Sequence, residues 1–326
     1  MSEDQMKLIS DFLHRYGREW KEEARNKLIS FITQLWGKFS AAKLADSHFI
    51  AEFTSGNKQK LVERYWEMLL GVRLLEAGLK PESKNEGPDF MLRTDDRGPI
   101  WIEAVCPTAG DGKNRIPGYG DDNWSKDKHG RPVVRQVPNE QINLRWTAAI
   151  KEKIDKRKKY IDNKKIDEND RYVIAVNSGN LGNLTDGFYG ISQYPRALEV
   201  VFALGCQQFT ISRETGDIVH RSVDYLPNIP NANNACVPTD SFLDKEYKGI
   251  SGILACHSHP FFSNTCGSGP IVGEYIYVMN PNALSPINRG ILPVDLDYWI
   301  EISVEDGNSS IREIRNTRKS GDTIPI

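Results

Sequence analysis

The sequence has few cysteines, no long apolar run and almost no net charge, and each shortage argues against a class of protein. Its five cysteines are an odd number without dense spacing, which disfavours a disulfide framework and favours a reducing cytoplasm. No apolar stretch approaches the roughly 20 residues of a transmembrane helix, and the first residues lack the sections of a secretory signal. A net charge of −2 excludes a chain that is basic throughout. We therefore expect a globular cytoplasmic protein without a membrane partner.

What is present is an ordinary globular composition and one local excess of basic residues. At 326 residues, with 39% hydrophobic and 26% charged residues, the chain is long enough to bury a sizeable core. Between Lys113 and Lys165, lysine and arginine outnumber acidic residues, and the densest run is 156–159. Such a run is most often a solvated helix face. It is nevertheless compatible with nucleic-acid binding, which needs only a local positive patch.

The first part of the chain has helical periodicity. Between residue 4 and about residue 50, apolar side chains recur at three- and four-residue spacings among charged ones. We assign residues 1–55 to an N-terminal helical region. A further helix is expected to begin after Asn57, a residue type that caps helices, and to end at Ala77-Gly78, where glycine suits a left-handed cap.

The periodicity then changes to that of strands. The runs 90–92 and 100–102 flank a turn at 94–98, which predicts an antiparallel hairpin. A loop rich in Gly, Pro, Asp and Asn spans 107–138, a helix is expected over 139–160 and a buried strand over 171–176. This order predicts an α/β fold, a mixed sheet flanked by helices within one domain, 56–326. Its C-terminal part should extend the sheet, with a helix at 198–203, strands at 208–212, 250–256 and 274–279, and a hairpin of 300–304 with 310–315 around Asp306-Gly307.

Two carboxylates stand out on the predicted hairpin. Asp89, in Gly-Pro-Asp-Phe, begins one strand, and Glu103 lies inside Ile-Trp-Ile-Glu-Ala-Val in the other. A buried carboxylate costs free energy unless it is paired or coordinated, although alternation could leave the face of Glu103 partly solvated. Divalent metals that assist phosphodiester hydrolysis take hard oxygen ligands on a rigid backbone. Asp89, Glu103 and the carbonyl of Ala104 could therefore converge on one ion.

From about residue 57 to residue 176 the chain resembles the PD-(D/E)xK nuclease superfamily. That family has a core of helix, three strands, helix and strand, and its motif is Pro-Asp followed by Asp/Glu-x-Lys. Pro88-Asp89 and Glu103-Ala104-Val105 occupy the motif positions. Glu67 resembles the helical glutamate that often precedes the motif, with Glu63 one turn earlier as its competitor.

Val105 departs from this pattern, because it occupies the position of the motif lysine. A cation from elsewhere would have to replace that lysine, or catalysis has been lost while nucleic-acid binding remains. The resemblance also places a glutamine or cation of the second helix beside the scissile phosphate, which Gln141 and Arg145 would match. The candidates for the missing cation are Lys84, Lys113, Arg145 and Lys153.

The resemblance implies a Mg²⁺- or Mn²⁺-dependent endonuclease. Asp89 and Glu103 would hold the metal, Glu67 would assist, Lys113 would be the first candidate for the missing cation, and Lys153 would help to bind DNA. RNA is not excluded as substrate. A homodimer joined through the N-terminal helices, and a role in restriction or antiviral defence, are further expectations from the resemblance.

A different site is conceivable around His257 and His259. The segment Cys-His-Ser-His-Pro at 256–260 resembles the zinc site of JAMM-type metalloproteases, whose motif also requires a serine and an aspartate downstream. Gly267 and Pro270 stand at those two positions, so the third ligand is missing. A structural zinc held with Cys256 and Cys266 is the remaining form of this alternative, and an ordinary strand end is the simpler interpretation.

Overall fold

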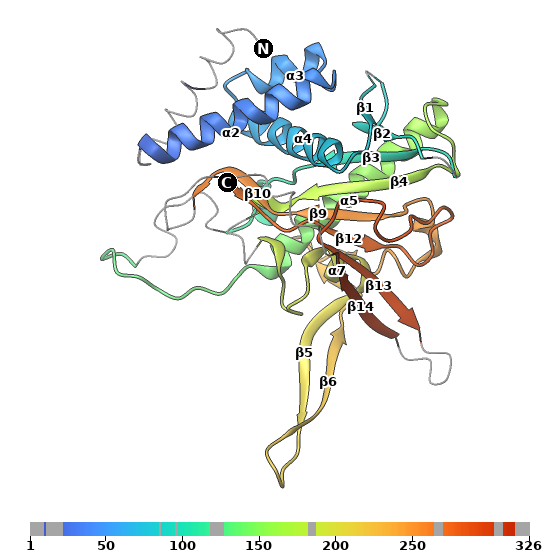
Figure 1. Cartoon of the computed structure of the whole chain (residues 1–326). Coiled ribbons are helices and arrows are strands. Elements are labelled where there is room, and N and C mark those ends of the chain that lie inside the picture. The colour runs from blue at the N-terminus through green and yellow to red at the C-terminus, as the bar shows by residue number, and fades with distance from the viewer. Residues whose placement is uncertain are drawn as a thin grey trace.

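The computed structural model describes residues 10, 22–84, 86–94, 97–117, 127–181, 187–263, 270–302 and 309–316. Its centre is an eight-stranded mixed sheet of order β1-β2-β3-β4-β9-β12-β13-β14 (Figure 1). The pairs β3–β4, β4–β9 and β12–β13 are parallel, and the other neighbours are antiparallel. The strands are β1 (Pro81–Glu82), β2 (Phe90–Leu92), β3 (Ile100–Val105), β4 (Arg171–Asn177), β9 (Gly252–Cys256), β12 (Ile276–Met279), β13 (Leu296–Ile302) and β14 (Ser309–Arg315).

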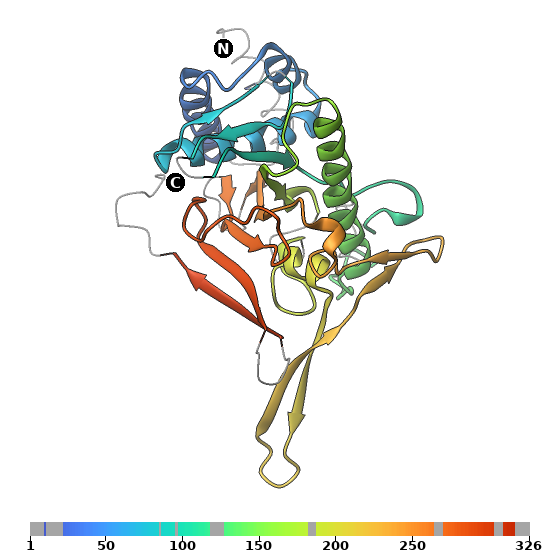
Figure 2. The same cartoon turned by 90° about the vertical axis from the view of Figure 1, so that its right-hand side faces the viewer.

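Helices cover both faces of the sheet (Figure 2). On one face lie α2 (Glu22–Ala41), α3 (Ser47–Phe53) and α4 (Lys58–Glu76), and on the other α5 (Asn139–Asp162) and α7 (Arg196–Phe202). Alternation along β3 divides its side chains between two cores: Ile100 and Ile102 pack with α4, and Trp101 packs with α5. The predicted α/β class and the mixed sheet between helices are confirmed. Within the described residues, no helix is both long and apolar enough to cross a membrane.

The helix that precedes the hairpin has the termini expected from its sequence. The Asn57 side chain accepts a hydrogen bond from the Lys60 amide at 3.2 Å, which caps the first turn of α4. Gly78 follows the helix with φ +77°, in the left-handed region. The described helices of the N-terminal region 1–55 share one hydrophobic core with α4 and the sheet.

Both predicted antiparallel pairings are present, whereas several short strands were not predicted. The pairing of β2 with β3 and of β13 with β14 is antiparallel as expected, while the turn at Asp306-Gly307 lies outside the described residues. The missed strand β1 has two residues, too few for a detectable period. The remaining elements are β5 (Leu204–Ile211), β6 (Ile218–Tyr225), β7 (Asn228–Pro230), β8 (Cys236–Pro238), β10 (Ser258–Ser263), β11 (Pro270–Val272), η1 (Gly112–Asn114), η2 (Ser178–Asn180) and η3 (Lys245–Tyr247).

Candidate active site

The pairing of β2 with β3 brings the two predicted carboxylates together. Phe90 pairs with Ile102, so Asp89, one residue before β2, lies beside the end of β3. There Asp89 Oδ2 accepts a hydrogen bond from the Ala104 amide at 2.7 Å. The juxtaposition that the sequence predicted is therefore present, with Ala104 beside both carboxylates.

Glu103 is fully buried, with 0% of its surface exposed, so its face of β3 is not the partly solvated one that alternation allowed. Three side chains of α5 reach it. Glu103 Oε1 lies 2.6 Å from Lys156 Nζ and 3.2 Å from Lys153 Nζ. The Tyr160 hydroxyl donates to the Gly87 carbonyl oxygen at 2.7 Å and lies 3.3 Å from Glu103 Oε2. Burial and the charge of Asp89 nevertheless raise the pKa of Glu103 to about 6, against the effect of the two lysines.

Glu67 of α4 belongs to the same carboxylate cluster. Its side chain is buried and paired with Arg64 one turn earlier on the helix. Burial, followed by the charges of Asp89 and other nearby acids including Glu103, raises its pKa well above the ordinary value. Three carboxylates from α4, the β2 side and β3 thus influence one another electrostatically. Glu67, which was singled out only through the family resemblance, lines the same cavity as Asp89.

A cavity of about 380 Å³ opens beside this cluster, between α4 and α5. Asp89, Glu67 and the Ala104–Val105 end of β3 line it, whereas the buried Glu103 lies behind Lys153, which does line it. Carboxylates and cations alternate on its walls, so a divalent metal and a phosphate group both have complementary charges there. The charged lining residues are Glu63, Glu67, Asp89 and Glu152 together with Lys60, Arg64, Arg145 and Lys153.

The candidates for the missing motif lysine fall in different places. Lys153 lines the cavity and contacts Glu103, and Arg145 lines it with its Nε donating to the Thr108 carbonyl oxygen at 2.8 Å. Lys113 is exposed on η1 and is not among the lining residues, so the geometry gives it no contact with the carboxylates. Lys84 lies over the Trp101 ring at 4.9 Å, and half-buried Gln141 does not line the cavity.

Two residues at the cluster, Lys156 and Tyr160, were not singled out from the sequence. Together with Lys153 they follow a spacing of three and four residues along α5, which places them on one helix face. The basic run 156–159 is not one solvated face, because Lys156 pairs with Glu103 while Arg157 is buried and donates to the Glu168 carbonyl oxygen. Helical spacing applied to that run was the signal that could have found them.

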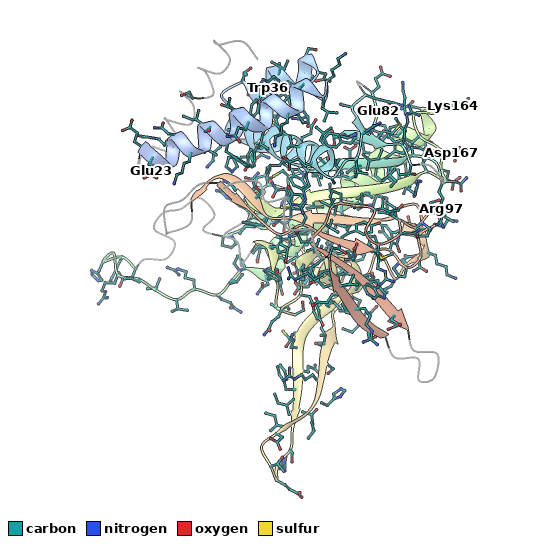
Figure 3. The ribbon with its side chains drawn as sticks, in the orientation of Figure 1. Glu23, Trp36, Glu82, Arg97, Lys164 and Asp167 are labelled. Carbon is teal, nitrogen blue, oxygen red and sulfur yellow. The ribbon has the colours of Figure 1, made fainter. Side chains whose placement is uncertain are left out.

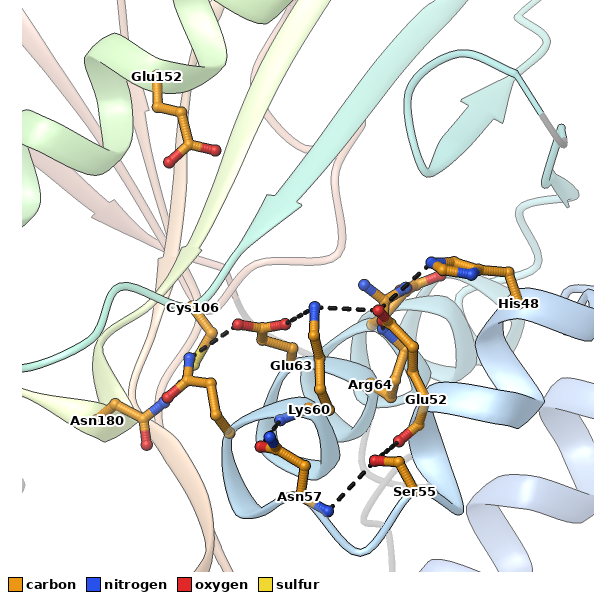
Figure 4. A network of polar contacts seen from close by, with 12 residues as sticks. His48, Glu52, Ser55, Asn57, Lys60, Glu63, Arg64, Cys106, Glu152 and Asn180 are labelled. Carbon is orange, nitrogen blue, oxygen red and sulfur yellow. Dashed lines mark hydrogen bonds and ion pairs between the residues drawn. The ribbon is translucent and has the colours of Figure 1, made fainter.

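The α4 wall of the cavity is held by a chain of ion pairs (Figure 4). Lys60 Nζ lies 3.0 Å from Glu52 and 3.3 Å from Glu63, and Arg64 Nε lies 3.2 Å from the other Glu52 oxygen. These ion pairs hold the Lys60 and Arg64 side chains at the edge of the cavity even when no ligand is bound. Cys106, also at the cavity, accepts a hydrogen bond from Asn180, and burial raises the pKa of its thiol, which disfavours a nucleophilic thiolate.

The donor chemistry of the cluster fits a hard divalent cation. Asp89, Glu103 and Glu67 are carboxylates whose mutual repulsion a bound cation would relieve. Among the described residues, however, no group of three or more His, Cys, Asp or Glu side chains already has the spacing of a metal site. The ammonium groups at Glu103 Oε1 occupy part of the space that an ion would take, so loading a metal requires those lysines to shift.

The residues of the alternative site at 256–260 are buried and make contacts within the fold. His257 and His259 are both buried, and His257 Nδ1 lies 3.0 Å from Ser178 Oγ. Cys256 Sγ is directed to the Gly273 carbonyl oxygen at 3.6 Å, and Cys266 lies outside the described residues. No group able to hold a metal is found there among the residues that the structure describes.

No family model, curated protein or solved structure matches the chain. What the site can do is therefore inferred from its own residues.

Proposed function

We propose that the protein is a metal-dependent nuclease of the PD-(D/E)xK type that hydrolyses phosphodiester bonds of DNA. The observation that carries the proposal is the convergence of Asp89, Glu103 and Lys153 at the end of β3, beside a cavity with cations on both walls. The order α4, β1, β2, β3, α5, β4 supports it, because helix, three strands, helix and strand is the order of that family's core.

Each residue then has a defined task. Asp89 and Glu103 would hold Mg²⁺ or Mn²⁺ with the Ala104 carbonyl, and the ion, when bound, supplies positive charge to the scissile phosphate. Lys153 holds an ammonium group between Glu103 and the cavity, which Val105 also lines, and would take the place of the motif lysine. Arg145 of α5 and Lys60 and Arg64 of α4 bind the flanking phosphates, so affinity falls steeply with salt.

The test is cleavage of plasmid, single-stranded DNA and RNA by the pure protein, with and without Mn²⁺. Asp89→Asn and Glu103→Gln should each abolish cutting while the circular dichroism spectrum stays unchanged. Glu86→Gln is the matched control, because this exposed carboxylate pairs only with Lys165 among described residues and lies three residues from Asp89. Cleavage that survives in Asp89→Asn, or that needs no metal, contradicts the proposal.

One observation favours a second candidate, a nucleic-acid-binding protein that does not cut. Lys156 Nζ lies 2.6 Å from Glu103, at the distance of a short ion pair, and thus neutralises the carboxylate without a metal. This candidate predicts DNA binding that is lost in Arg145→Ala, no cleavage with any divalent ion, and no binding of Mn²⁺ that depends on Asp89. Calorimetric titration with Mn²⁺ alone separates the two candidates.

A further inference from the structure

A largely exposed two-stranded ribbon is formed by β5 and β6, and we call it the arm (residues 204–225). It projects from the body, and its side chains stand clear of the rest of the molecule (Figures 1 to 3). At its base, the Leu226 amide donates to the Ala203 carbonyl oxygen and the Ala203 amide donates to the Thr239 carbonyl oxygen, both at 2.7 Å, and Gln207 Nε2 donates to the Ser192 carbonyl oxygen at 2.9 Å. An isolated hairpin is only marginally stable in water, so a ribbon of this length is expected to have a partner.

The register of the arm places apolar side chains on one face. Phe209 pairs with Arg221 and Ile211 pairs with Ile218, and paired residues of antiparallel strands share a face. A register shift between the pairs of Thr210 and Ile211 leaves Val219 as an extra residue, so Ile218 and Val219 both oppose Ile211. The bulge thereby concentrates three branched apolar side chains beside Phe209. We call Phe209, Ile211, Ile218 and Val219 the apolar face.

The apolar face is open to solvent, and the opposite face is polar. Phe209 is 46% exposed, Ile211 58% and Val219 63%. On the other face Gln208 pairs with Ser222 and Thr210 pairs with His220. An exposed apolar patch on one face of an amphipathic ribbon is typical of a surface that binds a partner.

The charge of the arm argues against nucleic acid as the partner that binds the apolar face. It carries two arginines, Arg213 and Arg221, against Glu214, Asp217 and Asp224, and a DNA-binding ribbon requires an excess of positive charge. The guanidinium group of Arg221 lies over the Phe209 ring at 5.7 Å, at the apolar face. Because the arm is nearly neutral and this face is apolar, two identical faces can pack together with little electrostatic repulsion.

We propose that the apolar face is the interface between two copies of this chain. With the exposed part of Tyr225, these side chains offer roughly 400–500 Å² per copy, so a two-fold pair buries roughly 800–1,000 Å² from them alone. The upper end of that range reaches the roughly 1,000 Å² expected of a specific interface. This proposal concerns assembly, stands independently of the nuclease proposal, and assigns the interface to the arm rather than to the N-terminal helices.

The test is the mass of the full chain by sedimentation velocity over a hundredfold range of concentration. The parent protein should show twice the 36.9 kDa of one chain, and the double variant Phe209→Ser, Ile211→Thr should raise the dissociation constant at least tenfold. Both positions are exposed, so the substitutions remove no core contacts. The matched control is Gln208→Ser with Thr210→Ser, on the polar face, which should dimerise like the parent.

Three outcomes overturn the proposal. One is a parent protein that stays monomeric at every concentration, and another is an apolar-face variant that dimerises as tightly as the parent. The third is a dimer broken equally by both double variants, because the effect would then come from the strands in general. The readout here is mass, so a failed nuclease assay does not affect this result. A failed dimer test likewise does not affect the nuclease proposal.

Discussion

At the scale of single residues, the feature that decides the chemistry is the pairing of buried Glu103 with cations of α5. A buried, unpaired carboxylate would be costly, and two lysines offset that cost. They also bring an ammonium group to the place where Val105 leaves the proposed motif incomplete. The same contacts thus serve stability and, in an active nuclease, the reaction.

Lys153 is therefore expected to be required for cleavage. Lys153→Ala should lower the cleavage rate by roughly 10²–10³-fold, because the ammonium group beside Glu103 and the cavity is lost. Adding Val105→Lys to that variant should raise its cleavage rate at least tenfold, since residue 105 lies two positions after Glu103 and on the same face of β3. Single-turnover rates at saturating Mn²⁺ measure both effects. Lys151→Ala, an exposed lysine of the same helix, is the control, and full activity in Lys153→Ala would contradict the assignment.

Tyr160 is expected to act as a positioning residue. Its hydroxyl donates to the Gly87 carbonyl oxygen near Asp89 and approaches Glu103, so it links the segment before β2 to β3 and thereby the two proposed metal ligands. In Tyr160→Phe the Mn²⁺ concentration for half-maximal cleavage should rise about tenfold, with a smaller change in the maximal rate. A merely structural role would instead lower the melting temperature and leave the metal requirement unchanged. Tyr247→Phe, on η3 and away from the cavity lining, provides the control.

Much of this site was predictable from the sequence, and the reason is local. Asp89, one residue before β2, and Glu103, on β3, belong to one short hairpin, whose antiparallel pairing was predicted from the sequence. The partners on α5 are some fifty residues further on, and which face of a helix meets the sheet depends on packing of the whole core. Lys113 was chosen and Lys156 was not considered, because only the three-dimensional structure shows that η1 is not at the cavity while α5 is.

At the scale of elements, regular periodicity explains what was predicted. The helices α4 and α5 and the strand β4 have long apolar patterns, and their bounds agree with the prediction to within a few residues. The strands β1, β7 and β8 have two or three residues each, too few to show alternation. The described residues of loop 107–138 are largely irregular, as predicted, with η1 among them.

The packing of α2 on α4 predicts a sharp contrast between two glycines. A Cβ at Gly71 would lie 2.6 Å from the buried Phe39 ring, whereas one at Gly37 would meet nothing within 4 Å. Gly71→Ala should therefore lower the free energy of unfolding by about 1–3 kcal/mol. Gly37→Ala, in the exposed middle of α2, should raise it by about 0.5–1 kcal/mol. Urea titration measures both, and a stabilised Gly71→Ala would show that the α2–α4 contact is looser than described.

At the scale of the whole molecule, two cores sandwich one sheet, and the candidate site lies where α4 and α5 approach from opposite faces. The α/β class followed from the order of elements, but the arm did not, since its strands carry polar and apolar residues in a pattern that gives no sign of projecting from the body. The net charge of −2 likewise does not reveal a cavity with four cations on its walls.

Global stability is expected to fall in mild acid because of two buried histidines. Burial lowers the pKa of His257 from its ordinary value near 6.5 to about 4, and that of His259 to about 3. Between pH 6.5 and 4 the unfolded chain binds protons that the folded chain excludes. The stabilisation is therefore complete above pH 6.5 and is lost as the pH falls, at about 1.4 kcal/mol per pH unit for each histidine.

The measurement is the free energy of unfolding in urea at pH 7.5, 6.0 and 5.0. Between pH 6.5 and 5.0 His257 alone should lower the stability of the parent by on the order of 2 kcal/mol. Glu103 and Glu67, whose pKa values burial raises, act in the opposite direction, so the readout is the difference in slope between the parent and the variant. His257→Gln removes one titrating group, so its stability should depend less steeply on pH whatever its absolute value. His220→Gln on the exposed arm should keep the parent slope. Equal slopes in the parent and in His257→Gln would mean that His257 takes up its proton in the folded state as easily as in the unfolded one.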